Sequence, residues 1–170
     1  TVDGGQTFQF VSWIGPEPGG WTIMPAGVRL PSSRILAALR CRGVAKDSQT
    51  APHWIDVYAS DDDGSTWTYV CRPVANTGLG GNPPTLTRLA DGHLCITYGF
   101  RDAPFGMRAV VSEDGGETWG REIILRDDGG NHDIGYPRAL LRPDGSLVTM
   151  YYYNDAAEGE RYIAATVWNP

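Results

Sequence analysis

An eight-residue pattern recurs along the chain and constrains the fold more than any other feature. The pattern S-x-D-x-G-x-T-W occupies residues 60–67 and 112–119, and residues 1–8 repeat it with Thr and Phe at the outer positions. In such a sequence the Asp carboxylate accepts hydrogen bonds from backbone N–H groups just ahead of it, while Gly adopts a positive φ. Each copy, which we call an octapeptide turn, therefore predicts a tight connection between two β-strands.

The acidic run Asp61-Asp62-Asp63 raises the alternative of a calcium loop. An EF-hand loop needs oxygen ligands at alternate positions, with Gly at the sixth and Glu at the twelfth. If Gly64 is the sixth residue, the first is Ala59, whose side chain carries no oxygen. We therefore interpret the run as part of a turn and predict no metal site.

A second repeat has the same period. A Pro stands seven residues before a turn residue three times, and an apolar run follows each turn: Pro25 and Ser32, Pro84 and Asp91, Pro137 and Asp144. Residues 25–42, 84–101 and 137–154 are thus predicted to form three β-hairpins. Third strands are expected at 54–59, 107–111 and 162–168, and fourth strands at 68–74 and 122–125.

Four antiparallel strands that repeat about every 50 to 60 residues are typical of the blades of a β-propeller. We expect an all-β fold, with one propeller unit over residues 1–170 and blade repeats at about 24–74, 83–126 and 136–168. The third repeat has no fourth strand, whereas residues 9–14 form a strand without a blade. The N-terminal strand segment, residues 1–14, is therefore expected to complete a four-stranded blade.

Three blades are too few to close a ring, because propellers have about 4 to 8. We expect half of a six-bladed propeller. Either the chain is the C-terminal half of a longer protein whose N-terminal half is missing here, or a homodimer completes the ring. Open end blades would otherwise expose apolar faces and strand edges.

Composition excludes several classes of partner. The net charge of −6 argues against nucleic acid, which requires a basic surface. No segment has the roughly 18 consecutive apolar residues of a membrane span, so no membrane partner is expected. The three Cys, at 41, 71 and 95, have no metal-binding spacing and lie in apolar runs, which indicates buried free thiols. The sequence predicts neither a metal nor a cofactor, and gives no compartment.

The octapeptide turns and matched hairpins resemble the Asp-box (BNR) repeats of the sialidase superfamily. The resemblance covers the whole chain and implies a six-bladed propeller in which the turns are structural. The hairpin turns and octapeptide turns then share one rim, and the longer loops form the opposite rim, where a site is expected.

Tyr136 opens an innermost strand at that functional rim. Sialidases have a nucleophilic Tyr at the start of such a strand, followed by a turn like Pro143-Asp144-Gly145, and the resemblance places Tyr136 in that role. A phenol with a pKa near 10 needs a carboxylate to accept its proton, and Asp133, Glu158 and Glu160 are candidates. The alternative is a Tyr that only fills the channel mouth.

Sialidases also bind the substrate carboxylate with arginines. The run Val28-Arg29-Leu30-Pro31 looks like their R-I-P signature, but alignment by the turns places its Pro at Pro25 and leaves Arg29 near the hairpin turn. The residues expected to contact substrate instead are Arg42, Arg101, Arg138 and Arg108, with Trp21 as a sugar-stacking ring. Each Arg has the alternative of a salt bridge to a neighbouring loop acid such as Asp102 or Asp155.

The sequence therefore supports three hypotheses. The first is a sialidase-like glycoside hydrolase, or its C-terminal half, with Tyr136 and Asp133 as catalytic residues. The second is a non-catalytic propeller that binds a glycan or a protein at the same rim. The third is a purely structural repeat scaffold.

Overall fold

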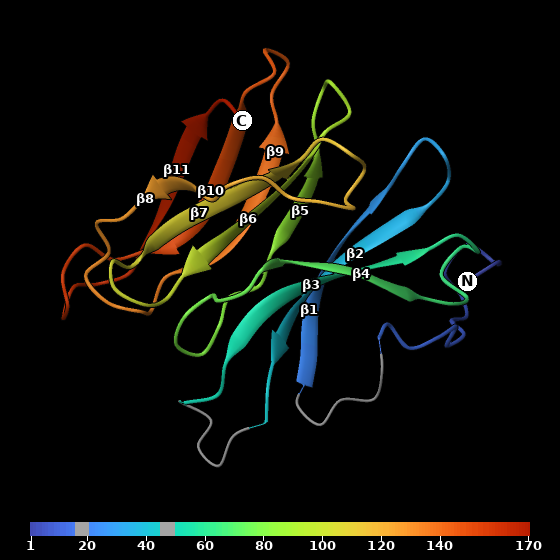
Figure 1. The fold of residues 1–170 in the computed structure, drawn as a ribbon, viewed down its shortest axis with the longest axis horizontal. Helices are drawn as coiled ribbons and strands as arrows, with labels where there is room; N and C mark the ends of the chain where they lie inside the picture. The colour runs from blue at the N-terminus through green and yellow to red at the C-terminus, as the bar shows by residue number, and fades with distance from the viewer. Residues whose placement is uncertain (16–20, 45–49) are drawn as a thin grey trace.

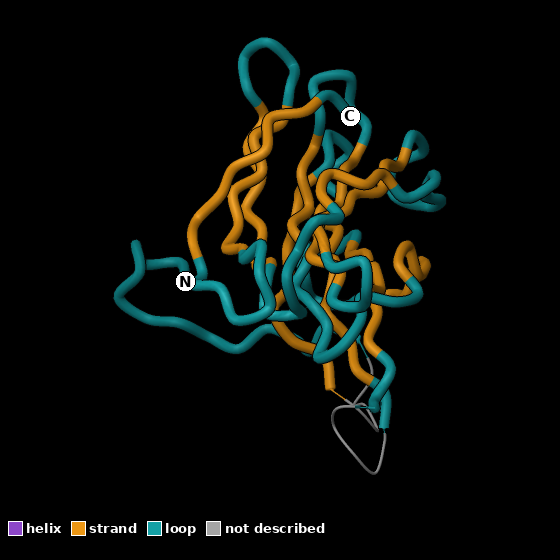
Figure 2. The backbone as a smooth tube through the Cα atoms, turned by 90° about the vertical axis from the view of Figure 1, so that its left-hand side faces the viewer, coloured by secondary structure: helices purple, strands orange, loops and turns teal. Residues whose placement is uncertain are grey.

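The computed structural model describes residues 1–15, 21–44 and 50–170, and these residues form strands and loops only (Figures 1 and 2). No helix in these ranges is long and apolar enough to cross a membrane. The first sheet contains β1 (Trp21–Arg29), β2 (Ile35–Arg42), β3 (His53–Ser60) and β4 (Thr68–Val74). The second contains β5 (Thr85–Arg88), β6 (Leu94–Phe100), β7 (Gly106–Ser112) and β8 (Ile123–Arg126). The third contains β9 (Gly135–Leu141), β10 (Leu147–Tyr153) and β11 (Tyr162–Trp168).

The strands of each sheet follow one another in chain order, and each pairs antiparallel with the next. The three predicted hairpins are present as β1–β2, β5–β6 and β9–β10. Side chains along a strand alternate between the two faces of its sheet, and their burial alternates with them. In β10, Leu147, Thr149, Tyr151 and Tyr153 are buried, while the residues between them are half-buried. Opposite faces of one strand thus contact different layers.

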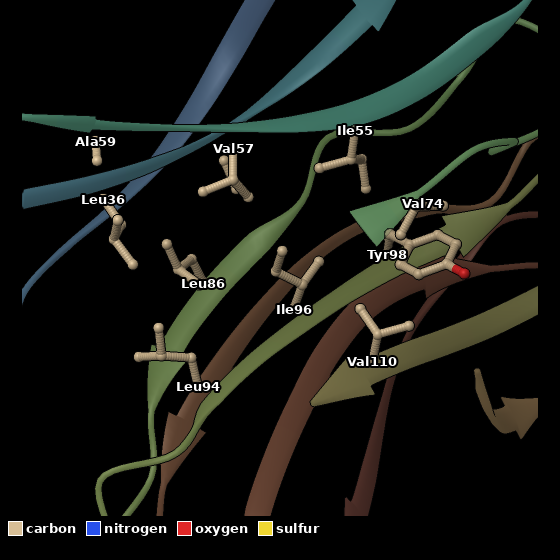
Figure 3. Close-up of a cluster of buried hydrophobic side chains, with 11 residues drawn as sticks. Leu36, Ile55, Val57, Ala59, Val74, Leu86, Leu94, Ile96, Tyr98 and Val110 are labelled. Carbon is tan, nitrogen blue, oxygen red and sulfur yellow. The ribbon is translucent and has the colours of Figure 1, made fainter. Parts of the chain in front are cut away.

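The sheets stack face to face, and the core lies between them. Leu36, Ile55 and Val57 of the first sheet pack against Leu94 and Ile96 of the second, and all five are at most 1% exposed (Figure 3). A second layer between the second and third sheets contains the buried residues Leu89, Cys95, Ala109, Met107, Ile134, Leu147, Tyr151 and Tyr153. The short strand β5 contacts both β1 and β9, so the first strands of the three sheets are neighbours (Figure 1).

The third sheet has three strands, in agreement with the absence of a fourth strand from the third repeat. Residues 9–14, expected as a closing strand, belong to no sheet in this chain. They run beside the first sheet, where the Ser12 hydroxyl donates a hydrogen bond to the Gly64 carbonyl and accepts one from Trp67 Nε1. Phe10 and Trp13 remain 70% and 75% exposed. Closure of a blade by this segment stays a prediction.

The octapeptide turns form as expected from their sequence. Asp62 Oδ1 accepts hydrogen bonds from Ser60 Oγ at 2.8 Å and from the Thr66 amide at 2.8 Å. Asp114 has the same partners in the second sheet, Ser112 and Thr118. These bonds lower the pKa of Asp62 and of Asp114 to about 2, with the Thr side chain as the main cause in each.

The hairpin turns and octapeptide turns lie on the same rim. Arg29, at the end of β1, forms a 2.7 Å ion pair with Asp63. Arg34 in the following turn forms ion pairs with Asp61 and Glu117. Arg29 is therefore remote from the opposite rim, which agrees with its exclusion from the site on sequence grounds.

Candidate functional site

A pocket of about 340 Å³ opens on the rim opposite the octapeptide turns. It lies where β2 ends, beside the first residues of β1 and β3, and the loops before β5 and β9 contribute to it. Its lining residues are Trp21, Arg40, Arg42, His53, Leu79, Gly80, Arg101 and His132. Three of these eight residues are arginines, and none is acidic. The described wall of the pocket is therefore cationic.

Arg40 is the most buried of the charges that line the pocket on β2. Leu36, Ala38 and Arg40 lie on one face of the strand, and this row runs from the core between the first two sheets to the rim. Two contacts hold the Arg40 guanidinium in place: Nη2 donates a hydrogen bond to the Gly80 carbonyl, and Nη1 lies 3.4 Å from the Tyr136 hydroxyl. The residue is 8% exposed, and its Nε is buried without a hydrogen-bond partner.

Within the described residues Arg40 forms no ion pair with a carboxylate. A buried charge is usually paired, because leaving it without a counter-charge is costly. Arg40 therefore gives the pocket an unneutralised positive charge.

Trp21 supports the arginines. The guanidinium of Arg42 lies 4.5 Å from the Trp21 ring centroid and that of Arg40 lies 5.1 Å from it. The His53 ring meets Trp21 edge-on at 5.8 Å. Cation–π contacts with the Trp21 ring orient the two guanidinium groups. Stacking of this ring on a sugar stays a prediction.

Arg101 approaches the pocket from the second sheet. Its Nε and Nη2 both donate to the Ile134 carbonyl, at 3.0 and 2.9 Å, and Nη2 also donates to the Tyr152 hydroxyl at 2.6 Å. Its guanidinium lies 5.6 Å from the Tyr136 ring centroid. Arg101 is 8% exposed and has no carboxylate ion pair within the described residues. The structure thus places Arg101 and Arg42 at one pocket and Arg101 beside Tyr136, while their roles in binding stay predictions.

Tyr136 lies in a bulge at the start of β9 and is 39% exposed. Its φ of 51° is in the left-handed region, which is rare for a bulky residue. The Tyr136 amide donates to Asn82 Oδ1 at 3.1 Å, and its ring packs at 5.8 Å on that of Tyr152. The hydroxyl faces Arg40 rather than a carboxylate.

Asp133, expected to accept the proton of Tyr136, is bonded elsewhere. Its Oδ1 accepts a hydrogen bond from Tyr152 at 2.8 Å, and its Oδ2 pairs with Arg161 at 2.9 Å. The Tyr152 hydrogen bond, followed by Arg161, lowers the pKa of Asp133. Burial, together with Asp133, raises the pKa of Tyr152 to about 12. The phenol that meets Asp133 is thus Tyr152 rather than Tyr136.

Two further arginines expected in the site lie outside the pocket. Arg108 is ion-paired with Glu122, and its guanidinium lies 3.8 Å from the Phe100 ring centroid. This pairing matches the salt-bridge alternative, although the partner is Glu122 rather than Asp102 or Asp155. Arg138 lines a separate cavity of about 470 Å³ beside Tyr136, along the first strands of the sheets. Its Nη1 donates to the Pro137 carbonyl.

Two histidines, His53 and His132, line the pocket. Burial, then the positive charge of Arg40, lowers the pKa of His53, so this ring is neutral near pH 7. No group of three His, Cys, Asp or Glu side chains in the described ranges is arranged to hold a metal ion. The imidazole of His53 therefore adds a neutral polar surface beside the arginines.

Sequence reasoning assigned no role to Arg40, Asn82 or Tyr152. Arg40 carries a recognisable signal, a charge on the core-facing side at the end of an otherwise apolar strand. Asn82 stands between Gly81 and Pro83 and reads as an ordinary loop residue. Tyr152 lies in an aromatic run whose register decides which rings reach the site.

No protein-family model matches the chain, and no curated protein matches it in sequence. Among solved structures it is similar to a protein of unknown function from Dyadobacter fermentans, with a TM-score of 0.69 and 28% identity over 91% of this chain and 39% of that one. It is also similar to an α-L-arabinofuranosidase from Fusarium graminearum, with a TM-score of 0.68 and 16% identity over 96% of this chain and 50% of the other. A Hadza microbial sialidase matches with a TM-score of 0.60 and 17% identity over 86% of this chain and 35% of its own.

The two named enzymes are β-propeller glycoside hydrolases. At these identities the likeness concerns the fold, and the chain spans only between a third and a half of the length of the three neighbours. The chain thus has an all-β, propeller-like fold built from antiparallel sheets.

Proposed function

We propose that this chain carries part of the substrate-binding rim of a glycosidase-like propeller, and that the pocket beside Tyr136 binds a negatively charged sugar. The observation that carries the proposal is the presence of Arg40, Arg42 and Arg101 around one pocket whose described wall has no carboxylate. Guanidinium groups bind carboxylates through charge-assisted hydrogen bonds, which are stronger than neutral ones.

The structural neighbours support the sugar part of the proposal. The arabinofuranosidase and the sialidase are glycoside hydrolases that share the fold with this chain. The charge of the pocket favours a sugar acid over a neutral pentose. A sialidase-like activity, with Tyr136 opposite the arginines, is the specific form of this proposal.

Titration calorimetry tests the binding step directly. N-acetylneuraminate and glucuronate are expected to bind the wild-type chain, and neutral arabinose to bind more weakly. Arg40→Gln should weaken binding of the acids about 10- to 100-fold, because a hydrogen bond to a charged group is lost. Arg29→Gln, on the opposite rim, is the matched control and should bind like the wild type. Equal affinity for arabinose and the acids would refute the anionic-sugar proposal.

A binding module without catalysis is the second candidate, and one observation favours it. The Tyr136 hydroxyl contacts Arg40 and has no hydrogen bond to a carboxylate within the described residues, so no group there takes its proton. Turnover of an aryl sialoside, lost in Tyr136→Phe, would support the hydrolase. Binding of N-acetylneuraminate without turnover would support the module.

We also propose that further blades cover the open face of the third sheet, supplied by a longer chain or by a second copy in a homodimer. On this sheet Ile163, Val167 and Leu140 are 79%, 55% and 60% exposed. Adjacent exposed apolar residues of this kind mark an interaction surface. Light scattering on the 170-residue chain separates the two sources: a mass of two copies supports the homodimer, and a stable 18.5 kDa monomer contradicts it.

A further inference from the structure

Asn82 is fully buried at the point where three site-forming segments meet. It lies in the loop between β4 and β5 and is 0% exposed. Its Oδ1 accepts hydrogen bonds from the amides of Gly99 and Tyr136, both at 3.1 Å. Its Nδ2 donates to the Ile134 carbonyl at 3.0 Å. One side chain thus joins the end of β6 to the start of β9.

Two glycines make room for this side chain. A Cβ on Gly135 would lie 2.2 Å from Asn82 Nδ2, and a Cβ on Gly99 would lie 2.9 Å from Asn82 Cγ. Gly135 also has a φ of 114°, which disfavours any other residue. The backbone on both sides of Asn82 is therefore shaped around it.

The Ile134 carbonyl links Asn82 to the arginines. This one oxygen accepts hydrogen bonds from Asn82 Nδ2 and from Nε and Nη2 of Arg101. A carbonyl held from one side by the amide presents a fixed acceptor to the guanidinium on the other. The orientation of Arg101 in the pocket thus depends on Asn82 through Ile134.

The backbone of Tyr136 needs such support. A positive φ at a bulky residue is strained and persists only where neighbouring groups hold it. Met24 occupies the equivalent position in the bulge of β1, with a φ of 53°. The two bulges converge, because Arg40 Nη1 lies 3.3 Å from Met24 Sδ and 3.4 Å from the Tyr136 hydroxyl. The conformation of Tyr136 is what brings its phenol to Arg40.

We propose that Asn82 is a positioning residue, which holds Tyr136 in the left-handed conformation and fixes the carbonyl that orients Arg101. The consequence for sugar binding rests on the function proposed above. The consequence for the backbone of Tyr136 does not, so the two can be measured separately.

Amide exchange and the three-bond HN–Hα coupling of Tyr136, both measured by NMR on the full chain, test the backbone consequence. Asn82→Ala should speed exchange of the Tyr136 amide at least about tenfold, since its acceptor is lost, and should change the coupling constant, which reports φ. Asn82→Asp keeps the acceptor oxygen and should retain protection. Ser112→Ala, which removes a buried hydroxyl in an octapeptide turn, is the matched control and should leave Tyr136 unchanged. If Asn82→Ala leaves both readouts unchanged, the proposal is wrong.

A double-mutant cycle tests the consequence for the site, with N-acetylneuraminate as the probe. Tyr136→Phe should weaken binding about tenfold in the wild type and less than about twofold in the Asn82→Ala background, because the phenol is then already displaced. Equal losses in both backgrounds would contradict the positioning role. If the wild type binds no sugar acid, the proposed function fails, and the exchange and coupling readouts still decide the role of Asn82. Should Asn82→Ala not fold, Asn82→Asp decides, because it keeps the acceptor for Tyr136 and loses the donor to the Ile134 carbonyl. The loss of sugar-acid binding caused by Arg101→Gln must then differ between the wild type and Asn82→Asp, and an equal loss in both would overturn the proposal.

Discussion

The hydroxyl of Tyr152 donates a 2.8 Å hydrogen bond to Oδ1 of Asp133. The same hydroxyl accepts a hydrogen bond from Arg101, and Arg161 pairs with the other oxygen of Asp133. Four residues from four segments thus share one network at the rim. The Asp133 carboxylate serves to fix Tyr152 and Arg101, while Tyr136 projects from beside this network toward Arg40.

Tyr152→Phe should raise the pKa of Asp133 toward its ordinary value. The hydrogen bond from Tyr152 stabilises the carboxylate and is the main cause of the lowered pKa, with Arg161 second. Carbon-detected NMR titration of the Asp133 carboxyl measures the change. Tyr162→Phe is the control, because it removes a phenol hydroxyl elsewhere on the third sheet. An unshifted Asp133 in Tyr152→Phe would show that Arg161 alone sets its pKa.

Arg40→Met should leave the free energy of unfolding unchanged or raise it. Arg40 is 8% exposed and has no ion pair among the described residues, so replacing it with an apolar chain removes an uncompensated charge. Urea unfolding measures the effect. The contrast is Arg72→Met, which should lower the free energy by about 1–3 kcal/mol because the buried Asp56 loses its partner. Marked destabilisation by Arg40→Met alone would show that Arg40 is structural rather than a binding residue.

The fold was largely predictable because local signals and period agree. The Pro-to-turn spacing located all three hairpins, and the octapeptide turns fixed which rim holds the loops, so that Arg29 was correctly placed away from the site. These features depend on residues close in sequence. Local hydrogen bonding and alternation are therefore enough to predict them.

The site was less predictable because its contacts join residues far apart in the chain. Asn82 and Tyr136 are 54 residues apart, and Arg40 and Tyr136 are 96 apart. Spacing within a strand places Arg101 and Tyr136 at the right rim, but it does not say which phenol reaches Asp133. That choice depends on the bulge at the start of β9, which turns Tyr136 toward Arg40.

Leu94→Ala should lower the free energy of unfolding by about 2–5 kcal/mol. Leu94 is 0% exposed between the first and second sheets, so truncation loses buried apolar area and leaves a cavity (Figure 3). Chemical unfolding followed by tryptophan fluorescence measures the change. Val44→Ala, at a residue 73% exposed, should change stability by less than about 0.5 kcal/mol. Truncation of a buried Leu to Ala usually lowers the free energy of unfolding by at least ~2 kcal/mol. A loss of less than about 1 kcal/mol at Leu94 would therefore mean that the two sheets separate easily.

The octapeptide turns should make the chain sensitive to acid between about pH 4 and pH 2. Their hydrogen bonds lower the pKa of Asp62 and Asp114 in the folded chain from 3.8 to about 2. A depressed folded-state pKa contributes stability above the unfolded pKa, and this contribution is lost as the pH falls through the folded pKa. Asp114→Asn should therefore lower the melting temperature at pH 7 and flatten its decline between pH 4 and pH 2. Asp155→Asn, on the opposite rim, is the control and should keep the wild-type slope. An unchanged slope in Asp114→Asn would show that the acid sensitivity arises outside this turn, for example at Asp128, whose pKa Arg126 also lowers to about 2.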